Sequence, residues 1–455
     1  MFYLDGQPFV ERVIDGYQYP DPEMKPKILQ WFGYFNACGD FYSHKEEVSL
    51  GDDYVSEDWT RGSLHPAKMI CSELANGIFN EGTNFTAESG NDRLQEWVTS
   101  IDLQTKCNRA SEWACALGTS ALLLKFGEVM EDGTIKSDTA IDLVRLDARN
   151  IYPIANTEDE IFKVAFVFPI TYMDLDIIQV SVCSNEGDYW SIENHWFSYG
   201  DNRKAEIIEV NVDMAPYIKV PGVPFALLKP AIPNTYSVGT CLGVSVYDSA
   251  IPAIELVDLG FQNFLNDLEK GQKMVFLDEG MLKGKRGHTR LPFRLKSVFV
   301  DVDRGLGEGA KHIDEYNPSL RAAENKDILS TALATLGLRV GFGPEHWQFD
   351  RTGRGIQTAT AAMMDRQDMV LTFKRHENSF RKPLQDLLIT IMAIWGYETQ
   401  CTVRYDDSIL TDTDRQREID RQEVAAGLMP RWAYIQKWNA LDEAEAKRWA
   451  DESIE

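Results

Sequence analysis

The residues of this chain that are best suited to binding chemistry form one basic cluster in an acidic sequence. The 455 residues carry a formal net charge of −25, yet the stretch 283–296, KGKRGHTRLPFRLK, contains no acid. Its basic residues are Lys283, Lys285, Arg286, Arg290, Arg294 and Lys296. Lys and Arg side chains bind phosphates and carboxylates, so the cluster is a candidate anion contact. A solvated basic hairpin without a role is the alternative, because charge runs are usually solvated faces.

Sequence patterns typical of enzymes are missing. There is no GxxxxGK[ST] or GxGxxG phosphate loop, no HExxH pair among the seven histidines and no GxSxG elbow. The acid pairs Asp52–Asp53 and Asp406–Asp407 could in principle hold a metal for phosphoryl chemistry. Such pairs are expected by chance among 71 acids, which favours solvated surface. The sequence therefore predicts no catalytic residue, no metal site and no cofactor.

Seven scattered cysteines favour a reducing compartment. They show no CxxC spacing, so we expect buried free thiols rather than a metal site or a disulfide framework. The N-terminus has no basic and then apolar pattern of a signal peptide, and no apolar run approaches the length of a membrane span. We therefore expect a soluble protein of the cytoplasm, built from more than one substructure because of its length.

The excess of acids argues against a protein that holds nucleic acid statically. Affinity for phosphate comes mainly from Lys and Arg, which release counterions when they bind it. The same acidity is compatible with a surface past which a polyanion slides, because repulsion lowers adhesion.

Hydrophobic periodicity divides the chain into a helical first part and a strand-rich middle. Residues 65–82 place Met69, Ile70, Leu74, Ile78 and Phe79 on one helical face, and further helices follow between 93 and 124. From 121 to 230 the chain consists of short strand-like runs between Gly, Asp, Asn and Pro turns, which indicates an antiparallel meander.

Two helices with an insertion between them are predicted next. The first covers about 249–270, with Ser249 as its N-cap, Pro252 in its first turn and Gly271 at its end. The second runs from a Ser319 cap to Gly337. The residues between them, which include the basic cluster, are predicted to form short strands, KMVFL and SVFVDV, with Gly-rich turns.

The last third begins with a Gly-rich loop, GLRVGFGPEHWQFDRTGRG, that composition predicts to be flexible. A long amphipathic helix follows, in which Pro383 predicts a kink or a break. A strand, TQCTVRY, leads to a charged tail whose Gly427 and Pro430 separate two helices.

The order of these parts resembles the portal proteins of tailed bacteriophages, in the branch with long non-contractile tails. Four stretches carry the resemblance: HPAKMICSELANGIFNEG, GVSVYDSAIPAIELVDLGFQNFLNDLEKGQKMVFL, GFGPEHWQFDRTGRGIQTAT and EVAAGLMPRWAYIQKWNALDEAEAKRWADE. Each pattern is weak singly, and their order over nearly the whole chain makes them specific jointly.

The resemblance implies an α+β portal fold with a helical and strand-rich wing, a two-helix stem, a small α/β clip insertion and a short helical crown. By position the parts are wing 1–240, stem helix 241–271, clip 272–318, stem helix 319–337, tunnel loop 338–355, a long kinked helix and returning wing strand 356–412, and crown 413–455.

The resemblance also implies a homo-oligomeric ring, usually of twelve subunits, at one vertex of the virion capsid. Its partners would be the terminase large subunit, the head–tail adaptor, the major capsid and scaffold proteins, and double-stranded DNA that passes without sequence preference. Arg339, His346, Trp347, Arg351 and Arg354 of the tunnel loop would contact DNA, although Trp347 and Phe349 are more often packing anchors. The basic cluster would lie in the clip and meet acidic partners or DNA.

Two other classes of protein stay open on the sequence alone. One is a monomeric capsid-associated or head-to-tail joining protein. The other is a metal-dependent nuclease that uses the clustered acids.

Overall fold

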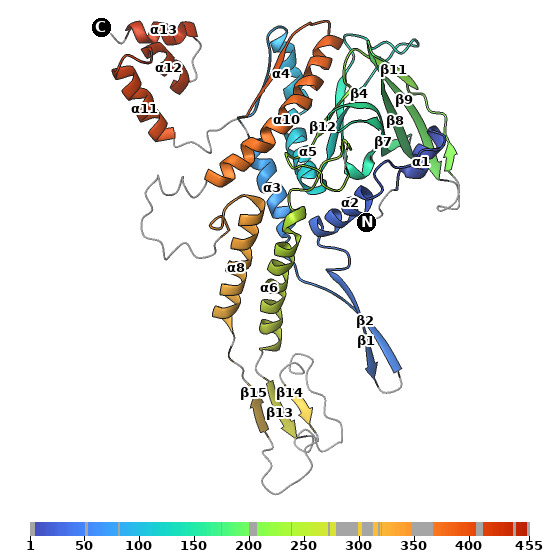
Figure 1. Ribbon diagram of the computed structural model, residues 1–455, viewed down its shortest axis with the longest axis vertical. Coiled ribbons are helices and arrows are strands. Elements are labelled where there is room, and N and C mark those ends of the chain that lie inside the picture. The colour runs from blue at the N-terminus through green and yellow to red at the C-terminus, as the bar shows by residue number, and fades with distance from the viewer. Residues whose placement is uncertain are drawn as a thin grey trace.

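The structure is a computed structural model that describes residues 5–50, 53–80, 82–173, 175–199, 207–237, 239–271, 274–278, 299–302, 313–316, 319, 321–347, 367–405, 413–439 and 443–452. Helices and strands are mixed along the chain, which confirms the predicted α+β class. Two long helices, α6 (Ile251–Lys270) and α8 (Ala322–Val340), lie side by side and extend away from a larger body (Figure 1). Across the described ranges, no helix combines the length and the apolarity needed to cross a bilayer.

The strand-rich middle is confirmed. Its strands are β4 (Ser120–Phe126), β5 (Ile141–Asp147), β6 (Ile151–Asn156), β7 (Ile161–Tyr172), β8 (Leu175–Asn185), β9 (Trp190–Tyr199), β10 (Ile207–Glu209), β11 (Tyr217–Val220) and β12 (Phe225–Leu228). Among the described residues they form two sheets, one in the order β10-β9-β8-β7-β6 with β11 also paired to β9, and one in the order β12-β4-β5. Each of these pairs is antiparallel, as a meander requires.

The first part is helical, as predicted, but it also contains strands that the sequence pattern did not reveal. Its helices are α1 (Gln7–Val13), α2 (Met24–Phe35), α3 (Pro66–Ile78), α4 (Asn91–Ser100) and α5 (Leu103–Leu117). The missed strands are β1 (Ser43–Leu50) and β2 (Asp53–Thr60), which form a hairpin, and β3 (Asn84–Ala87). β3 pairs with β16 (Cys401–Arg404), so two segments that are far apart in the sequence meet in one small sheet.

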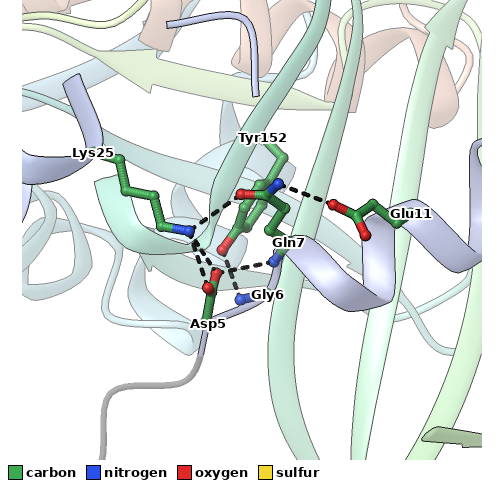
Figure 2. A network of polar contacts seen from close by, with 6 residues as sticks. All are labelled: Asp5, Gly6, Gln7, Glu11, Lys25 and Tyr152. Atoms are coloured by element: carbon green, nitrogen blue, oxygen red, sulfur yellow. Dashed lines mark hydrogen bonds and ion pairs between the residues drawn. The ribbon is translucent and has the colours of Figure 1, made fainter. Parts of the chain in front are cut away.

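A polar network fastens α1 to the large sheet (Figure 2). The Lys25 ammonium donates to both carboxylate oxygens of Asp5, at 3.0 and 2.9 Å, and to Gln7 Oε1 at 3.2 Å. The backbone N–H of Gly6 donates to the hydroxyl of Tyr152, on β6, at 2.8 Å. Gly6 also leaves no room for a Cβ beside the Tyr152 ring, so a larger residue there would displace it.

The predicted helix pair with its insertion is present, with different caps. α6 (Ile251–Lys270) follows a 3₁₀ turn at Asp248–Ala250, so its N-cap is Ala250 rather than Ser249. Pro252 lies in its first turn and Gly271 caps its end, as predicted. α8 (Ala322–Val340) begins after Arg321, which makes the Ser319 cap wrong. Gly337 does not end α8, which continues to Val340. The Gly337 carbonyl instead accepts the hydrogen bonds from the N–H groups of Gly341 and Phe342 that close the helix.

Short strands lie between α6 and α8. β13 (Met274–Asp278) and β14 (Phe299–Val302) match the predicted strands, and β15 (Ile313–Tyr316) is an additional one. β13 pairs in parallel with β14 and antiparallel with β15.

α10 (Gln367–Ile394) runs through Pro383 as one helix, so the break is excluded and the kink stays a prediction. Proline inside a helix costs about 3 kcal/mol, and burial on both sides of it offsets that cost. Phe380 and Leu384 flank the proline and are both buried. The predicted start of this helix, 357–366, lies outside the described residues.

The tail contains one helix more than predicted in its described part. α11 (Thr413–Ala425) and α12 (Arg431–Asn439) are separated at Gly427 and Pro430, as expected. The third helix is α13 (Glu443–Glu452).

All seven cysteines are free thiols, and all except Cys38 are buried. Burial raises the pKa of the Cys241 thiol to about 12 and that of Cys401 to about 11. The prediction of buried, unreactive thiols is therefore confirmed for six of the seven.

The base of α6 is anchored through a buried carboxylate. Asp258 is 0% exposed and accepts hydrogen bonds from the Tyr42 hydroxyl at 2.7 Å, the Ser63 hydroxyl at 2.9 Å and the Leu64 N–H at 2.9 Å. Burial raises the pKa of Asp258, and these three hydrogen bonds oppose the shift. One helical turn further, Gln262 accepts from the Gly62 N–H at 2.6 Å. Residues on both sides of the β1–β2 hairpin thus hold α6 to the body.

We expect Asp258→Ala to lower the free energy of unfolding by roughly 2–4 kcal/mol, because it leaves the buried Tyr42 hydroxyl and two partly buried donors without their acceptor. Urea denaturation followed by tryptophan fluorescence measures the loss. Asp15→Ala removes an exposed carboxylate and is the matched control, expected to stay within about 0.5 kcal/mol of the unmodified protein. Equal unfolding midpoints for the two variants would contradict the anchoring role.

Candidate functional site

The described residues contain three of the eleven side chains predicted to meet DNA or partners. These three are Arg339, His346 and Trp347. Arg351, Arg354 and all six basic residues of 283–296 lie outside the described residues. The described part of the candidate site consists of α6, α8 and the segment 341–347 that follows α8.

α6 and α8 are joined along their length. Asp267 of α6 accepts hydrogen bonds from Arg321 at 2.7 Å and from Asn325 at 2.7 Å. These bonds lower the pKa of Asp267, with the Arg321 bond as the larger cause. Nearer the body, Gly260 faces Ile328, and a Cβ on Gly260 would lie 3.5 Å from that side chain. That distance is an ordinary van der Waals contact, so the two helices pack against each other here without requiring a glycine.

The end of α8 is a Schellman turn, which corrects the predicted position of Arg339. Gly341 has φ 81°, in the left-handed region, and the Phe342 N–H donates to the Gly337 carbonyl at 2.9 Å. Arg339 therefore lies in the last turn of α8 rather than in a loop, and its side chain is exposed. A cation in the last turn of a helix interacts favourably with the helix dipole.

The segment after α8 packs onto α3 and α10. Phe342 is buried, and its ring contacts the rings of His346, Trp347 and Phe373 edge-on, with centroids 5.0, 5.4 and 5.9 Å away. Gly77 of α3 leaves no room for a Cβ beside the Phe373 ring. These contacts place three helices that are distant in sequence around one aromatic cluster.

Glu73 of α3 binds this segment through both of its carboxylate oxygens. His346 Nε2 lies 2.6 Å from Glu73 Oε2, and Trp347 Nε1 donates to Oε1 at 3.1 Å and to Oε2 at 3.2 Å. The sequence predicted a loop that is flexible by composition, and residues 341–347 are instead held by side-chain bonds. Trp347 is a packing residue here, which is the alternative that the sequence had favoured for it.

A threonine connects α10 to the end of α8. The Thr372 hydroxyl donates to the carbonyls of Gly341, at 2.8 Å, and Asp368, at 3.0 Å. A shallow depression between the two helices is lined by Leu338, Gly341, Gly343, Asp368, Leu371 and Thr372. The start of α10 is therefore placed directly beside the end of α8.

Large apolar side chains along α6 and α8 are substantially exposed. They are Leu256 (42% exposed), Leu259 (40%), Leu268 (43%), Ile328 (45%) and Leu338 (62%). Leu268 is exposed because α6 extends beyond the body. Leu256 and Leu259 were missed, although apolar residues on more than one side of a helix are themselves a signal of burial.

No group of three or more His, Cys, Asp or Glu side chains that could hold a metal occurs within the described ranges. The pair Asp406–Asp407 and the residue Asp52 lie outside them.

A model of the family described as "Phage portal protein, SPP1 Gp6-like" matches residues 40–455. The chain belongs to this family. It is a family of structural proteins rather than of enzymes, so the nuclease alternative loses its support. No curated protein matches the chain.

Two solved structures that resemble this portal protein come from GTA particles. "Neck of native GTA particle computed with C12 symmetry" is 10% identical, with 85% of this chain and 89% of that chain covered and a TM-score of 0.41. "Neck of empty GTA particle computed with C6 symmetry" is 9% identical, with 92% and 94% covered and a TM-score of 0.44. At these TM-scores, neither structure shows what this chain does.

Glu73→Ala should release residues 341–347, since it removes the acceptor for both His346 and Trp347. We expect amide hydrogen exchange in this segment to accelerate by about tenfold or more, because charge-assisted hydrogen bonds contribute roughly 1.5–3 kcal/mol. Glu96→Ala, which removes an exposed acid of α4, is the control and should leave the exchange unchanged. Unchanged exchange in the Glu73 variant would mean that the aromatic contacts alone hold the segment.

His376 of α10 should make the portal protein lose stability in acid. It is 3% exposed and accepts a hydrogen bond from the Ala231 N–H at 3.1 Å, and burial lowers its pKa from 6.5 to about 4. A histidine with a depressed pKa stabilises the fold above pH 6.5, and that contribution is lost as the pH falls from 6.5 to about 4, by roughly 3 kcal/mol.

Urea unfolding between pH 7 and pH 4 measures this slope. His376→Asn keeps an acceptor without a titrating group, so its stability should fall less steeply over the same range. His195→Asn, at a partly exposed position, should keep the slope of the unmodified protein. Parallel slopes for His376→Asn and the unmodified protein would show that another group controls the loss.

Proposed function

We propose that this portal family member forms a ring at one vertex of a phage capsid, through which double-stranded DNA is packaged and later ejected. The match of the family over residues 40–455 is the observation that carries the proposal. The ring is assembled in the host bacterial cytoplasm, and it docks the terminase motor during packaging and the head–tail adaptor afterwards. Scaffold and major capsid proteins surround it at the vertex.

The exposed apolar faces of α6 and α8 support a ring. Leucine and isoleucine side chains that are 40% or more exposed lie on both helices, and a monomer would leave them in water. A head-to-tail contact between identical copies covers such faces and closes into a ring when the rotation between copies is constant. The α6–α8 pair is then the stem of the portal.

The other parts follow from the position of the stem. Strands β13, β14 and β15, with the basic residues of 283–296, form the clip that meets the motor and the adaptor. The segment from 341 to 355 is the tunnel loop, and α11 to α13 are the crown. The remaining elements form the wing.

The net charge of −25 fits a channel through which DNA moves. A ring multiplies this charge, and a negative wall repels phosphate, so that the duplex passes without adhering. The positive residues that touch DNA are then Arg339, at the end of α8, and Arg351 and Arg354, which follow it in the sequence. His346 and Trp347 hold the start of the loop to α3 through their bonds to Glu73.

The substitutions Leu256→Glu and Leu259→Glu together should prevent ring formation, because they place charges on the face of α6 that a neighbouring copy covers. Light scattering and negative-stain imaging measure the fraction of rings, which we expect to fall at least tenfold. Met173→Glu with Leu175→Glu is the matched control, since both residues are exposed but lie at the turn between β7 and β8.

The control pair should leave rings intact. Rings that persist in the α6 variant would contradict the proposed stem contact. If the unmodified protein stays monomeric even with capsid and scaffold proteins, this result would favour the alternative of a monomeric capsid-associated or head-to-tail joining protein.

A further inference from the structure

Three exposed basic side chains lie on the body around the partly buried carboxylate of Glu112. They are Lys68 on α3, Arg109 on α5 and Arg145 on β5, and we call them the cationic patch. Burial raises the pKa of Glu112, and the charges of Lys68 and Arg145 oppose that rise, so both lie close to the carboxylate. Burial lowers the pKa of Arg145, and the like charge of Arg109 lowers it further, so these two guanidinium groups are also close together.

The acids nearby leave the cationic patch with an excess of positive charge. Within the described residues, none of its three members forms an ion pair with a carboxylate. Asp147, the other acid that acts on Arg145, is bound by Arg149 instead, whose Nε and Nη2 donate to its two oxygens at 3.0 and 2.7 Å. Three cations therefore surround one carboxylate, that of Glu112.

The other acids of α3, α5 and β5 do not neutralise the cationic patch. Glu73, the acid of α3, binds His346 and Trp347. Asp142 of β5 is paired with Lys106. Asp102 lies immediately before α5, about 10 Å along the helix from Arg109. The patch is therefore suited to a carboxylate from outside the chain.

The β1–β2 hairpin has the complementary charge. Residues 43–60 contain one base, Lys45, and six acids, which are Glu46, Glu47, Asp52, Asp53, Glu57 and Asp58. Lys45 pairs with Asp58 at 3.9 Å. Glu46 and Glu57 are cross-strand partners in the register, and like charges in opposing positions destabilise a pair of strands. A cation from outside the hairpin would remove this repulsion.

The hairpin has a fixed base and lacks a third strand. The Arg61 N–H donates to the Tyr42 carbonyl at 2.8 Å, and the His44 ring stacks on Trp59 with centroids 4.3 Å apart. From this base the hairpin projects away from the body (Figure 1), and the described residues add no further strand to its sheet. Two strands alone are marginally stable in water, which indicates that another surface covers the hairpin.

The cationic patch and the hairpin lie on opposite sides of α2. The Phe32 ring stacks on Trp113, the ring over which Arg145 lies, with centroids 6.3 Å apart. The Tyr34 ring contacts Phe41, at the base of the hairpin, with centroids 6.1 Å apart. Two residues of a helix correspond to about 200°, so Phe32 and Tyr34 face nearly opposite directions. Two different surfaces on opposite sides of a subunit are what a head-to-tail contact in a ring requires.

We infer that the cationic patch of one copy binds the acidic β1–β2 hairpin of a second copy in the ring. The inference rests on the proposed function, and it adds an electrostatic contact to the apolar contact of the stem. Guanidinium groups bind carboxylates with two parallel hydrogen bonds, so the pairing also fixes how far one copy is rotated against the next. Every copy supplies both surfaces, and a closed ring therefore leaves none of them uncovered.

The test exchanges the charges of the two surfaces in the full-length protein. Arg109→Glu with Arg145→Glu reverses the cationic patch, and Glu46→Lys with Glu57→Lys reverses the hairpin. A third variant carries all four substitutions and has the net charge of the unmodified protein. Light scattering and negative-stain imaging measure the fraction of protein in rings, under conditions in which the unmodified protein forms them.

Each reversed surface should lower the fraction of rings at least about tenfold, because it places like charges across the contact. The variant with all four substitutions should return to within about twofold of the unmodified protein, since opposite charges face one another again. Misfolding does not explain such a recovery, because two damaged surfaces would not repair each other. The control, Lys125→Glu with Lys219→Glu, makes the same change in charge as the patch variant at exposed positions of β4 and β11 and should keep its rings.

Rings that persist in the patch variant would overturn the inference and assign the patch to a partner other than a second copy. Loss of rings in both reversed variants without recovery in the combined variant would also overturn it. In both cases the rings of the unmodified protein leave the portal proposal standing. An unmodified protein that forms no rings even with capsid and scaffold proteins would remove the portal proposal and this contact together.

Discussion

The burial of one carboxylate, Asp258, is the constraint on which the rest of the structure depends. A long helix that leaves the body of a protein gains little from its own packing, so its direction must be fixed where it begins. Asp258 fixes it by accepting three hydrogen bonds from residues on both sides of the β1–β2 hairpin. An apolar residue at this position would bury area but would not specify one orientation, because it would leave those donors unsatisfied.

The consequences of this anchor extend to both ends of the helix pair. α8 is hydrogen-bonded to Asp267 of α6 and packs against α6 at Gly260. Its direction is therefore fixed by that of α6. The end of α8 is in turn fixed to α3 by Glu73 and to α10 by Thr372. A displacement of the far end of the helix pair would therefore also move the segment 341–347 and the start of α10.

Charge and apolar surface act against one another in the proposed ring. Copies that each carry −25 repel, and repulsion weakens at physiological salt because charges are screened beyond about 8 Å. Contact between apolar faces of α6 and α8 operates at short range and is not screened. Because the apolar contact is short-ranged and the repulsion is screened, the surfaces of the proposed ring can stay acidic while the copies adhere along their helices.

Features that depend on local pattern could be predicted from the sequence. The strands between 121 and 230 are short apolar runs that end at turn residues, and the buried face of α3 follows the helical period. Both predictions are confirmed because near neighbours determine them. The β13 and β14 strands were found for the same reason.

Features that depend on distant partners could not be predicted. The pairing of β3 with β16 and the bonds of Glu73 to His346 and Trp347 join positions that no local pattern connects. Ser249 and Ser319 looked like caps, but the 3₁₀ turn before α6 and the later start of α8 displaced them. Pro383 predicted a kink or a break, and the helix is continuous there, with Phe380 and Leu384 buried beside the proline.

The central claim is that copies of this chain assemble around a channel. The most direct measurement is the mass and shape of the unmodified protein by light scattering and negative-stain imaging, alone and then with its capsid and scaffold proteins. The account predicts closed rings with a central hole, in which α6 and α8 of neighbouring copies lie against one another. A protein that stays monomeric under both conditions would contradict it.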